Sequence, residues 1–190
     1  MTAAGAAPAA PKILVYGDSL SAAYGIAKSR GWVALLDARL KREGPDYSVV
    51  NASISGETTR GGLARMPDVL ARVRPAVIIL QLGANDGLRG LPIERMKHNL
   101  GAMIEQAKRA GARVLLVGMQ LPPNWGPEYT EAFEQAFTML AATHGTALAP
   151  FLFAGLEDGP THFLPDRLHP TEAAQPIILD TVWAPLQPLL

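Results

Sequence analysis

The sequence contains no cysteine, and this absence excludes several kinds of chemistry. Disulfide bridges, a thiolate nucleophile and a cysteine-ligated zinc site all need a thiol. Long apolar runs are also lacking, because no stretch approaches the roughly 20 residues that a helix needs to cross a bilayer. We therefore expect no stable membrane insertion. Net charge is absent too, with 17 basic and 17 acidic side chains, and the basic residues form no cluster, so we expect no nucleic-acid partner.

The chain of 190 residues has the length of one ordinary domain. Its start, MTAAGAAPAAP, is rich in alanine and proline. This start has neither the basic beginning nor the apolar core of an intact signal peptide, and its composition is typical of disorder. We predict a disordered tail over residues 1–10 and a single domain over residues 11–190.

Five short apolar runs recur along the chain, with helical patterns between them. The runs cover residues 12–16, 47–51, 76–82, 113–118 and, more weakly, 146–149. The first four are rich in valine, isoleucine and leucine and barely alternate, as in strands that are covered on both faces. Strands alternating with helices predict an α/β fold with a parallel five-stranded sheet. We expect the strand order 2-1-3-4-5.

Small and polar residues follow the first three predicted strands. They occupy residues 17–19, 51–59 and 83–87, and a fourth polar segment, 166–170, precedes the last apolar stretch. In open parallel sheets, ligands bind beyond the carboxyl ends of the strands. The three strand-end segments should therefore meet at one rim, and we expect the functional site there.

Three residues of these segments match the needs of a serine nucleophile. A serine hydroxyl requires a base within hydrogen-bond reach, and the base requires an orienting group. Ser19 is the candidate nucleophile, His169 the candidate base and Asp166 the group that would orient the imidazole and favour its protonated form. His162 is a weaker candidate for the base, because no acidic residue lies three positions before it. Asp18, next to Ser19, is expected to brace the loop through backbone hydrogen bonds.

The same segments offer donors for an oxyanion hole. The backbone N–H groups of Ser19 and Gly56 and the side-chain amide of Asn85 are the candidates. A glycine lets the backbone approach a substrate closely, and an amide donates without carrying charge. Each residue also has a simpler explanation: Ser19 as a helix cap or turn residue, and Gly56 and Asn85 as turn residues.

The chain resembles the SGNH (GDSL) hydrolases. Four blocks stand in the family's order: GDSL at 17–20, Gly56, GAND at 83–86 and DRLH at 166–169. The segments GDSLSAAYGI, VVNASISGETT and HPTEAAQP resemble one branch more closely, the bacterial periplasmic thioesterase I/protease I/lysophospholipase and arylesterase enzymes. The likeness covers nearly the whole chain from about residue 12. One departure is Ala84, where the family often has a second glycine, and we expect this change to alter loop stiffness rather than chemistry.

The resemblance implies a three-layer α/β/α, flavodoxin-like fold and hydrolysis of carboxylic esters and acyl thioesters without a cofactor. It also implies a periplasmic or secreted enzyme that takes small-molecule acyl substrates, and we expect a monomer. The residues themselves show no spacing of histidines and carboxylates that indicates a metal site. Two alternatives remain open: a carbohydrate O-acetyl esterase, and a non-catalytic flavodoxin-like module that binds a small ligand.

Two loops on the expected rim, 87–92 and 120–127, are the candidates for binding an acyl chain. Their apolar residues could line a groove: Leu88, Leu91, Leu121, Pro122 and Trp125. The alternative, that these residues make only ordinary loop contacts, is equally open at this point.

Overall fold

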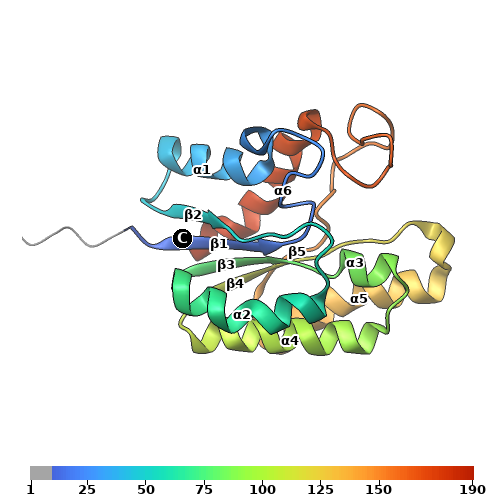
Figure 1. The fold of residues 1–190 in the computed structure, drawn as a ribbon, viewed down its shortest axis with the longest axis horizontal. Helices are drawn as coiled ribbons and strands as arrows, with labels where there is room; N and C mark the ends of the chain where they lie inside the picture. Colours follow the sequence, from blue (N-terminus) through green and yellow to red (C-terminus); the bar gives the residue numbers. More distant parts are fainter. Residues whose placement is uncertain (1–9) are drawn as a thin grey trace, which may run out of the picture.

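A parallel five-stranded sheet forms the centre of the protein in the computed structural model, which describes residues 10–190 (Figure 1). The strand order is β2-β1-β3-β4-β5, which confirms the predicted order. Almost all of the predicted tail, residues 1–10, lies outside the described residues. The strands are β1 (Lys12–Gly17), β2 (Ser48–Asn51), β3 (Val77–Gln81), β4 (Arg113–Val117) and β5 (Ala147–Ala149).

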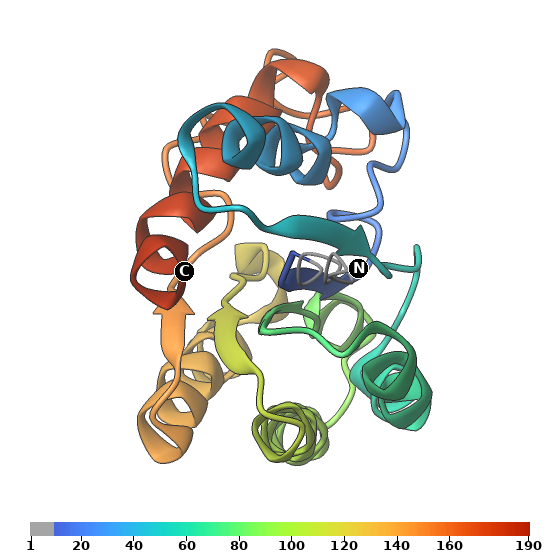
Figure 2. The ribbon, with the colours of Figure 1, turned by 90° about the vertical axis from the view of Figure 1, so that its left-hand side faces the viewer.

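Helices cover both faces of the sheet, which gives the three layers of an α/β/α fold (Figures 1 and 2). Helices α1 and α6 lie on one face, and α2, α4 and α5 lie on the other. These helices are α1 (Trp32–Glu43), α2 (Thr59–Val73), α4 (Ile93–Arg109), α5 (Pro127–His144) and α6 (Gln175–Leu186). The shorter elements are α3 (Ala84–Leu88) and the 3-10 turns η1 (Lys28–Arg30), η2 (Pro123–Trp125), η3 (Glu172–Ala174) and η4 (Gln187–Leu189).

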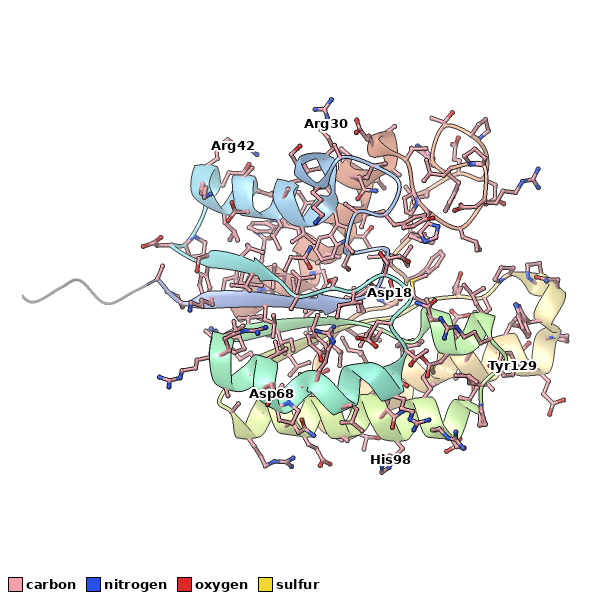
Figure 3. All side chains as sticks on the ribbon, viewed as in Figure 1. Asp18, Arg30, Arg42, Asp68, His98 and Tyr129 are labelled. Atoms are coloured by element: carbon pink, nitrogen blue, oxygen red, sulfur yellow. The ribbon has the colours of Figure 1, made fainter. Side chains whose placement is uncertain are left out.

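Double coverage of the sheet explains why its central strands read as continuous apolar runs. Every residue of β3 is buried, and so are five of the six residues of β1. Between the strands, the apolar residues recur at helical spacing and face the sheet. On α4, for example, Met96, Leu100 and Met103 are almost fully buried, whereas His98 points away from the sheet (Figure 3).

The parallel arrangement brings the carboxyl ends of all five strands to one rim. Asp18 lies at this rim, directly after β1 (Figure 3). The segments after β2 and β3 lie beside it, since the Ile54 N–H donates to the Gly17 carbonyl over 3.0 Å and the Asn85 amide nitrogen lies 3.4 Å from Asp18 Oδ2. The sheet therefore gathers the predicted strand-end segments as expected.

No helix within residues 10–190 combines the length and the apolar character needed to cross a membrane.

Candidate active site

Ser19, His169 and Asp166 form a continuous chain of hydrogen bonds. Ser19 Oγ lies 2.9 Å from Nε2 of His169, although the two residues are 150 positions apart in the sequence. The other ring nitrogen, Nδ1, lies 2.7 Å from Oδ2 of Asp166. With the proton on Nδ1, Nε2 is free to accept the hydroxyl proton of Ser19. The geometry is therefore that of a nucleophile, a base and an orienting carboxylate.

The Asp166 carboxylate is held in its charged form by its own loop. Its Oδ1 accepts the backbone N–H groups of Leu168 and His169, over 2.9 and 3.0 Å. Burial acts to raise the pKa of Asp166, but these two bonds and the His169 side chain outweigh it and hold the pKa at about 2. Asp166 is therefore ionised near neutral pH and can accept the Nδ1–H of the imidazole.

Asp18 is wholly buried beneath the site and is bonded on both oxygens. Its Oδ1 accepts the Leu20 N–H over 3.0 Å and the Gln81 amide over 3.1 Å. Its Oδ2 lies 3.4 Å from the Asn85 amide nitrogen. The bond from Leu20 is of the loop-bracing kind expected from the sequence. Burial raises the pKa of Asp18 to about 6, because an ionised carboxylate loses its hydration there.

This raised pKa predicts a pH-dependent effect of Asp18→Asn on stability. The folded state binds the Asp18 proton more tightly than the unfolded state, whose pKa is near 3.8. The stability associated with this proton is fully present below pH 3.8 and is lost as the pH rises through 6. Because an amide does not ionise, the free energy of unfolding of the variant should shift relative to wild type by about 2 kcal/mol between pH 4 and pH 8, in favour of the variant.

Urea unfolding at pH 4, 6 and 8 measures this shift. The pH dependence isolates the effect of ionisation from any constant change in hydrogen bonding, such as the amide–amide contact that the variant would create with Asn85. Asp68→Asn, on the surface of α2 (Figure 3), is the matched control and should change little with pH. An Asp18→Asn difference that stays constant from pH 4 to pH 8 contradicts the prediction.

The other two predicted oxyanion donors, Asn85 and Gly56, differ in placement. Asn85, in α3, lines the same cavity as Ser19, and its amide donates to the Glu57 carbonyl over 3.0 Å. Gly56 is exposed and has a positive φ of 78°, a conformation that favours glycine. It does not line that cavity, but its carbonyl accepts the Arg89 guanidinium over 3.0 Å. Two polar contacts therefore tie the Gly56 loop to α3 and the residue after it.

A buried carboxylate strengthens the same connection between α3 and α2. Asp86 accepts the backbone N–H of Thr59 over 2.8 Å and its hydroxyl over 2.6 Å. The residue just before α3, Gly83, has a positive φ of +119°, a conformation that favours glycine. Ala84 begins the right-handed helix α3, where a Cβ is tolerated, so this position does not need a glycine for its backbone conformation.

A cavity of about 430 Å³ opens beside Ser19 and His169. Three of the predicted acyl-binding residues line it: Leu88, Leu121 and Pro122. Leu91 and Trp125 do not. The Leu91 carbonyl accepts the hydroxyl of Tyr129, on α5 (Figure 3), over 2.8 Å, and Trp125 lines a separate depression together with Tyr129. The structure therefore does not bring these two residues to the lining of the cavity beside Ser19, and both have contacts with Tyr129 of α5 instead.

The sequence pattern did not indicate several residues of this cavity. The segment after β5 contributes Phe151, Phe153 and Leu156, and the loop before Asp166 contributes Phe163. The rings of Phe153 and Phe163 pack against each other, with their centroids 5.4 Å apart. The predicted fifth strand was a signal for them, because the residues after a parallel strand must also reach the rim.

His162, the weaker candidate for the base, is not part of the Ser19–His169–Asp166 chain of hydrogen bonds. Its Nδ1 accepts the Glu157 N–H over 2.9 Å, whereas the ring of His169 reaches Ser19. The structure therefore favours His169 as the base.

Known proteins share both the sequence and the fold of this chain. The sequence profile of the GDSL-like lipase/acylhydrolase family matches residues 15–176. Esterase TesA of Pseudomonas aeruginosa is 52% identical over 182 residues, which cover 96% of this chain and 90% of the relative. The thioesterase 1/protease 1/lysophospholipase L1 of Escherichia coli K12 is 40% identical over 97% of this chain and 87% of its own length.

The likeness extends to a solved structure. A crystal structure of TesA, 51% identical, superimposes with a TM-score of 0.92 and covers 94% of this chain and 99% of its own. The chain therefore belongs to the GDSL-like lipase/acylhydrolase family, the family of serine esterases and thioesterases whose four blocks it carries.

Proposed function

We propose that this protein hydrolyses carboxylic esters and acyl thioesters through an acyl-enzyme on Ser19. The observation that carries the proposal is the Ser19–His169–Asp166 chain of 2.9 and 2.7 Å contacts at the wall of an apolar cavity. The esterase and thioesterase relatives support the choice of bond.

In the first half of the reaction, Ser19 Oγ attacks the acyl carbonyl carbon while His169 Nε2 takes the hydroxyl proton. Asp166 holds the Nδ1–H and stabilises the positive charge on the ring. The carbonyl oxygen becomes an oxyanion, which receives hydrogen bonds from the Ser19 and Gly56 N–H groups and from Asn85.

The tetrahedral intermediate then collapses, and the bond to the leaving oxygen or sulfur breaks. His169 gives its proton to the leaving alcohol. With a thioester, the proton goes to the leaving thiol, or to solvent once the thiolate has left, so in both cases the ring is neutral again before deacylation. A water molecule next gives a proton to His169 and attacks the acyl-enzyme carbonyl carbon. Collapse of the second intermediate breaks the bond to Ser19 Oγ, which regains the proton, and releases the carboxylic acid.

A serine-directed phosphonate tests the nucleophile directly. A p-nitrophenyl alkylphosphonate should label the protein with one phosphonyl group and abolish its activity, because the Ser19 hydroxyl has a base at hydrogen-bond distance. Peptide mass spectrometry should place the added mass on the peptide containing Ser19. Inactivation with the added mass on another residue contradicts the assignment.

The apolar cavity favours acyl chains longer than acetyl. Leucine, proline and phenylalanine side chains dominate the wall beside Ser19, and each methylene buried there contributes about 0.8 kcal/mol. A series of p-nitrophenyl esters and acyl-CoA thioesters from C2 to C12 should show kcat/KM rising with chain length. Strict preference for acetyl groups would favour the carbohydrate O-acetyl esterase instead.

Two further proposals concern the setting of the enzyme and rest on the family resemblance. We propose that the enzyme acts in the periplasm or outside the cell, which fractionation of cells that express it would test. We also propose that it acts as a monomer, which light scattering of the purified protein would test.

A further inference from the structure

We propose that Tyr24 is a positioning residue that holds the imidazole of His169 and stabilises its positive charge during the reaction. The inference rests on the proposed function, in which His169 is the base. The two rings lie with centroids 4.4 Å apart and planes inclined by 40°. Tyr24 nevertheless remains 52% exposed, so burial in the core does not account for its position.

Backbone hydrogen bonds fix Tyr24 relative to the nucleophile. The Tyr24 N–H donates to the carbonyl of Ser19 over 3.1 Å, and the Ala22 N–H donates to the carbonyl of Asp18 over 2.9 Å. A single compact turn therefore carries Ser19 at one end and the ring that covers its base at the other. Movement of the turn would displace both together.

The turn adopts an uncommon backbone to make this contact. Ala23 has a φ of 59°, in the left-handed region that residues with a side chain rarely adopt. Strained backbone at such a place points to a function. Gly25 also has a positive φ, of 76°, and a Cβ there would lie only 2.5 Å from Leu164.

This close approach docks the turn on the loop that bears the base. The Leu164 N–H donates to the carbonyl of His169 over 2.8 Å. The turn and the histidine loop thus meet at two points, Gly25 against Leu164 and Tyr24 against His169. The Tyr24 contact therefore adds to the hydrogen bonds that the imidazole makes with Asp166 and Ser19.

The chemical contribution comes from the face of the aromatic ring. This face is electron-rich and attracts a cation placed against it. His169 becomes such a cation when it takes the proton of Ser19. At a partly exposed site the attraction corresponds to a rate effect of about 2–5-fold. Phenylalanine would keep this face, whereas leucine would keep an apolar side chain without it.

Steady-state hydrolysis of p-nitrophenyl butyrate by Tyr24→Phe and Tyr24→Leu tests the proposal. We expect Tyr24→Leu to lower kcat by about 2–5-fold with little change in KM, and Tyr24→Phe to retain the wild-type kcat. Met139→Ala, which trims another exposed apolar side chain (53% exposed, on α5), is the matched control and should retain both constants. Thermal unfolding of each variant verifies that it is folded.

Three outcomes would overturn the proposal: an unchanged kcat in Tyr24→Leu, a Tyr24→Phe variant as slow as Tyr24→Leu, or an effect confined to KM. The last would assign the ring to substrate binding. Ser19→Ala separates this inference from the proposed function. If Ser19→Ala is inactive and the Tyr24 variants are unaffected, only the role of Tyr24 fails. If Ser19→Ala remains active, the proposed function itself fails.

Discussion

Ser19→Ala should abolish ester hydrolysis, with kcat for p-nitrophenyl butyrate lowered by roughly 10⁴–10⁶-fold. The substitution removes the hydroxyl that lies 2.9 Å from the His169 ring, so no acyl-enzyme can form. Residual turnover would come from water attack on a substrate held near the oxyanion donors. Ser19 is only 9% exposed, and alanine fills less space than serine there, so the variant should fold normally.

The control for this prediction is Ser48→Ala. Ser48 begins β2, at the amino end of the strand and thus away from the rim that carries the site. It should keep wild-type kcat and KM. A Ser19→Ala preparation that retains more than about 1% of wild-type kcat would rule out Ser19 as the nucleophile, provided that mass spectrometry verifies the substitution.

Asn85→Ala should lower kcat by roughly 10²–10³-fold, the usual effect of losing one oxyanion donor. The Asn85 amide lines the cavity beside Ser19 and is oriented by the Glu57 carbonyl at 3.0 Å. Because the oxyanion develops only in the transition state, the loss should appear in kcat and not in KM.

Asn85→Asp sharpens the same test. A carboxylate has the shape of the amide but offers no N–H group when ionised, and it would stand near the Asp18 carboxylate and the developing oxyanion. We expect this variant to be at least as slow as Asn85→Ala at pH 8. A fall of less than about threefold in Asn85→Ala would remove the residue from the oxyanion hole.

The fold was largely predictable because residue type reflects the pattern of burial. Continuous apolar runs indicated strands covered on both faces, and β1, β3 and β4 lie within one or two residues of the predicted ranges. The apolar pattern does not itself give the strand order, but right-handed crossovers restrict the possibilities, and the expected order is confirmed. Polar segments directly after three of these strands were enough to predict that Ser19 and Asn85 share one rim.

Which loop residues line the cavity depends on the path of each loop, and the spacing of apolar residues in the sequence does not reveal that path. Leu91 and Trp125 are as apolar as Leu88 and Leu121, yet they lie toward α5 and outside the cavity. Phe151 and Phe153 lie just beyond β5, whose three residues form too short an apolar run to mark a strand end clearly.

The electrostatics of the site are hidden from the sequence for a similar reason. The raised pKa of Asp18 arises from its burial beneath the site, and only the assembled fold reveals such burial. The sequence alone shows an aspartate in a small polar segment, where a solvent-exposed turn residue would look the same.

The 150-residue separation between Ser19 and His169 has a consequence for biosynthesis. A nascent polypeptide still on the ribosome, or a fragment cut by a protease before residue 166, contains the hydroxyl but not the imidazole that activates it. Under the proposed mechanism, such partial products are harmless to cellular acyl pools. Catalytic competence thus arrives only after residues 166–169 have been synthesised and have folded against the end of the first strand.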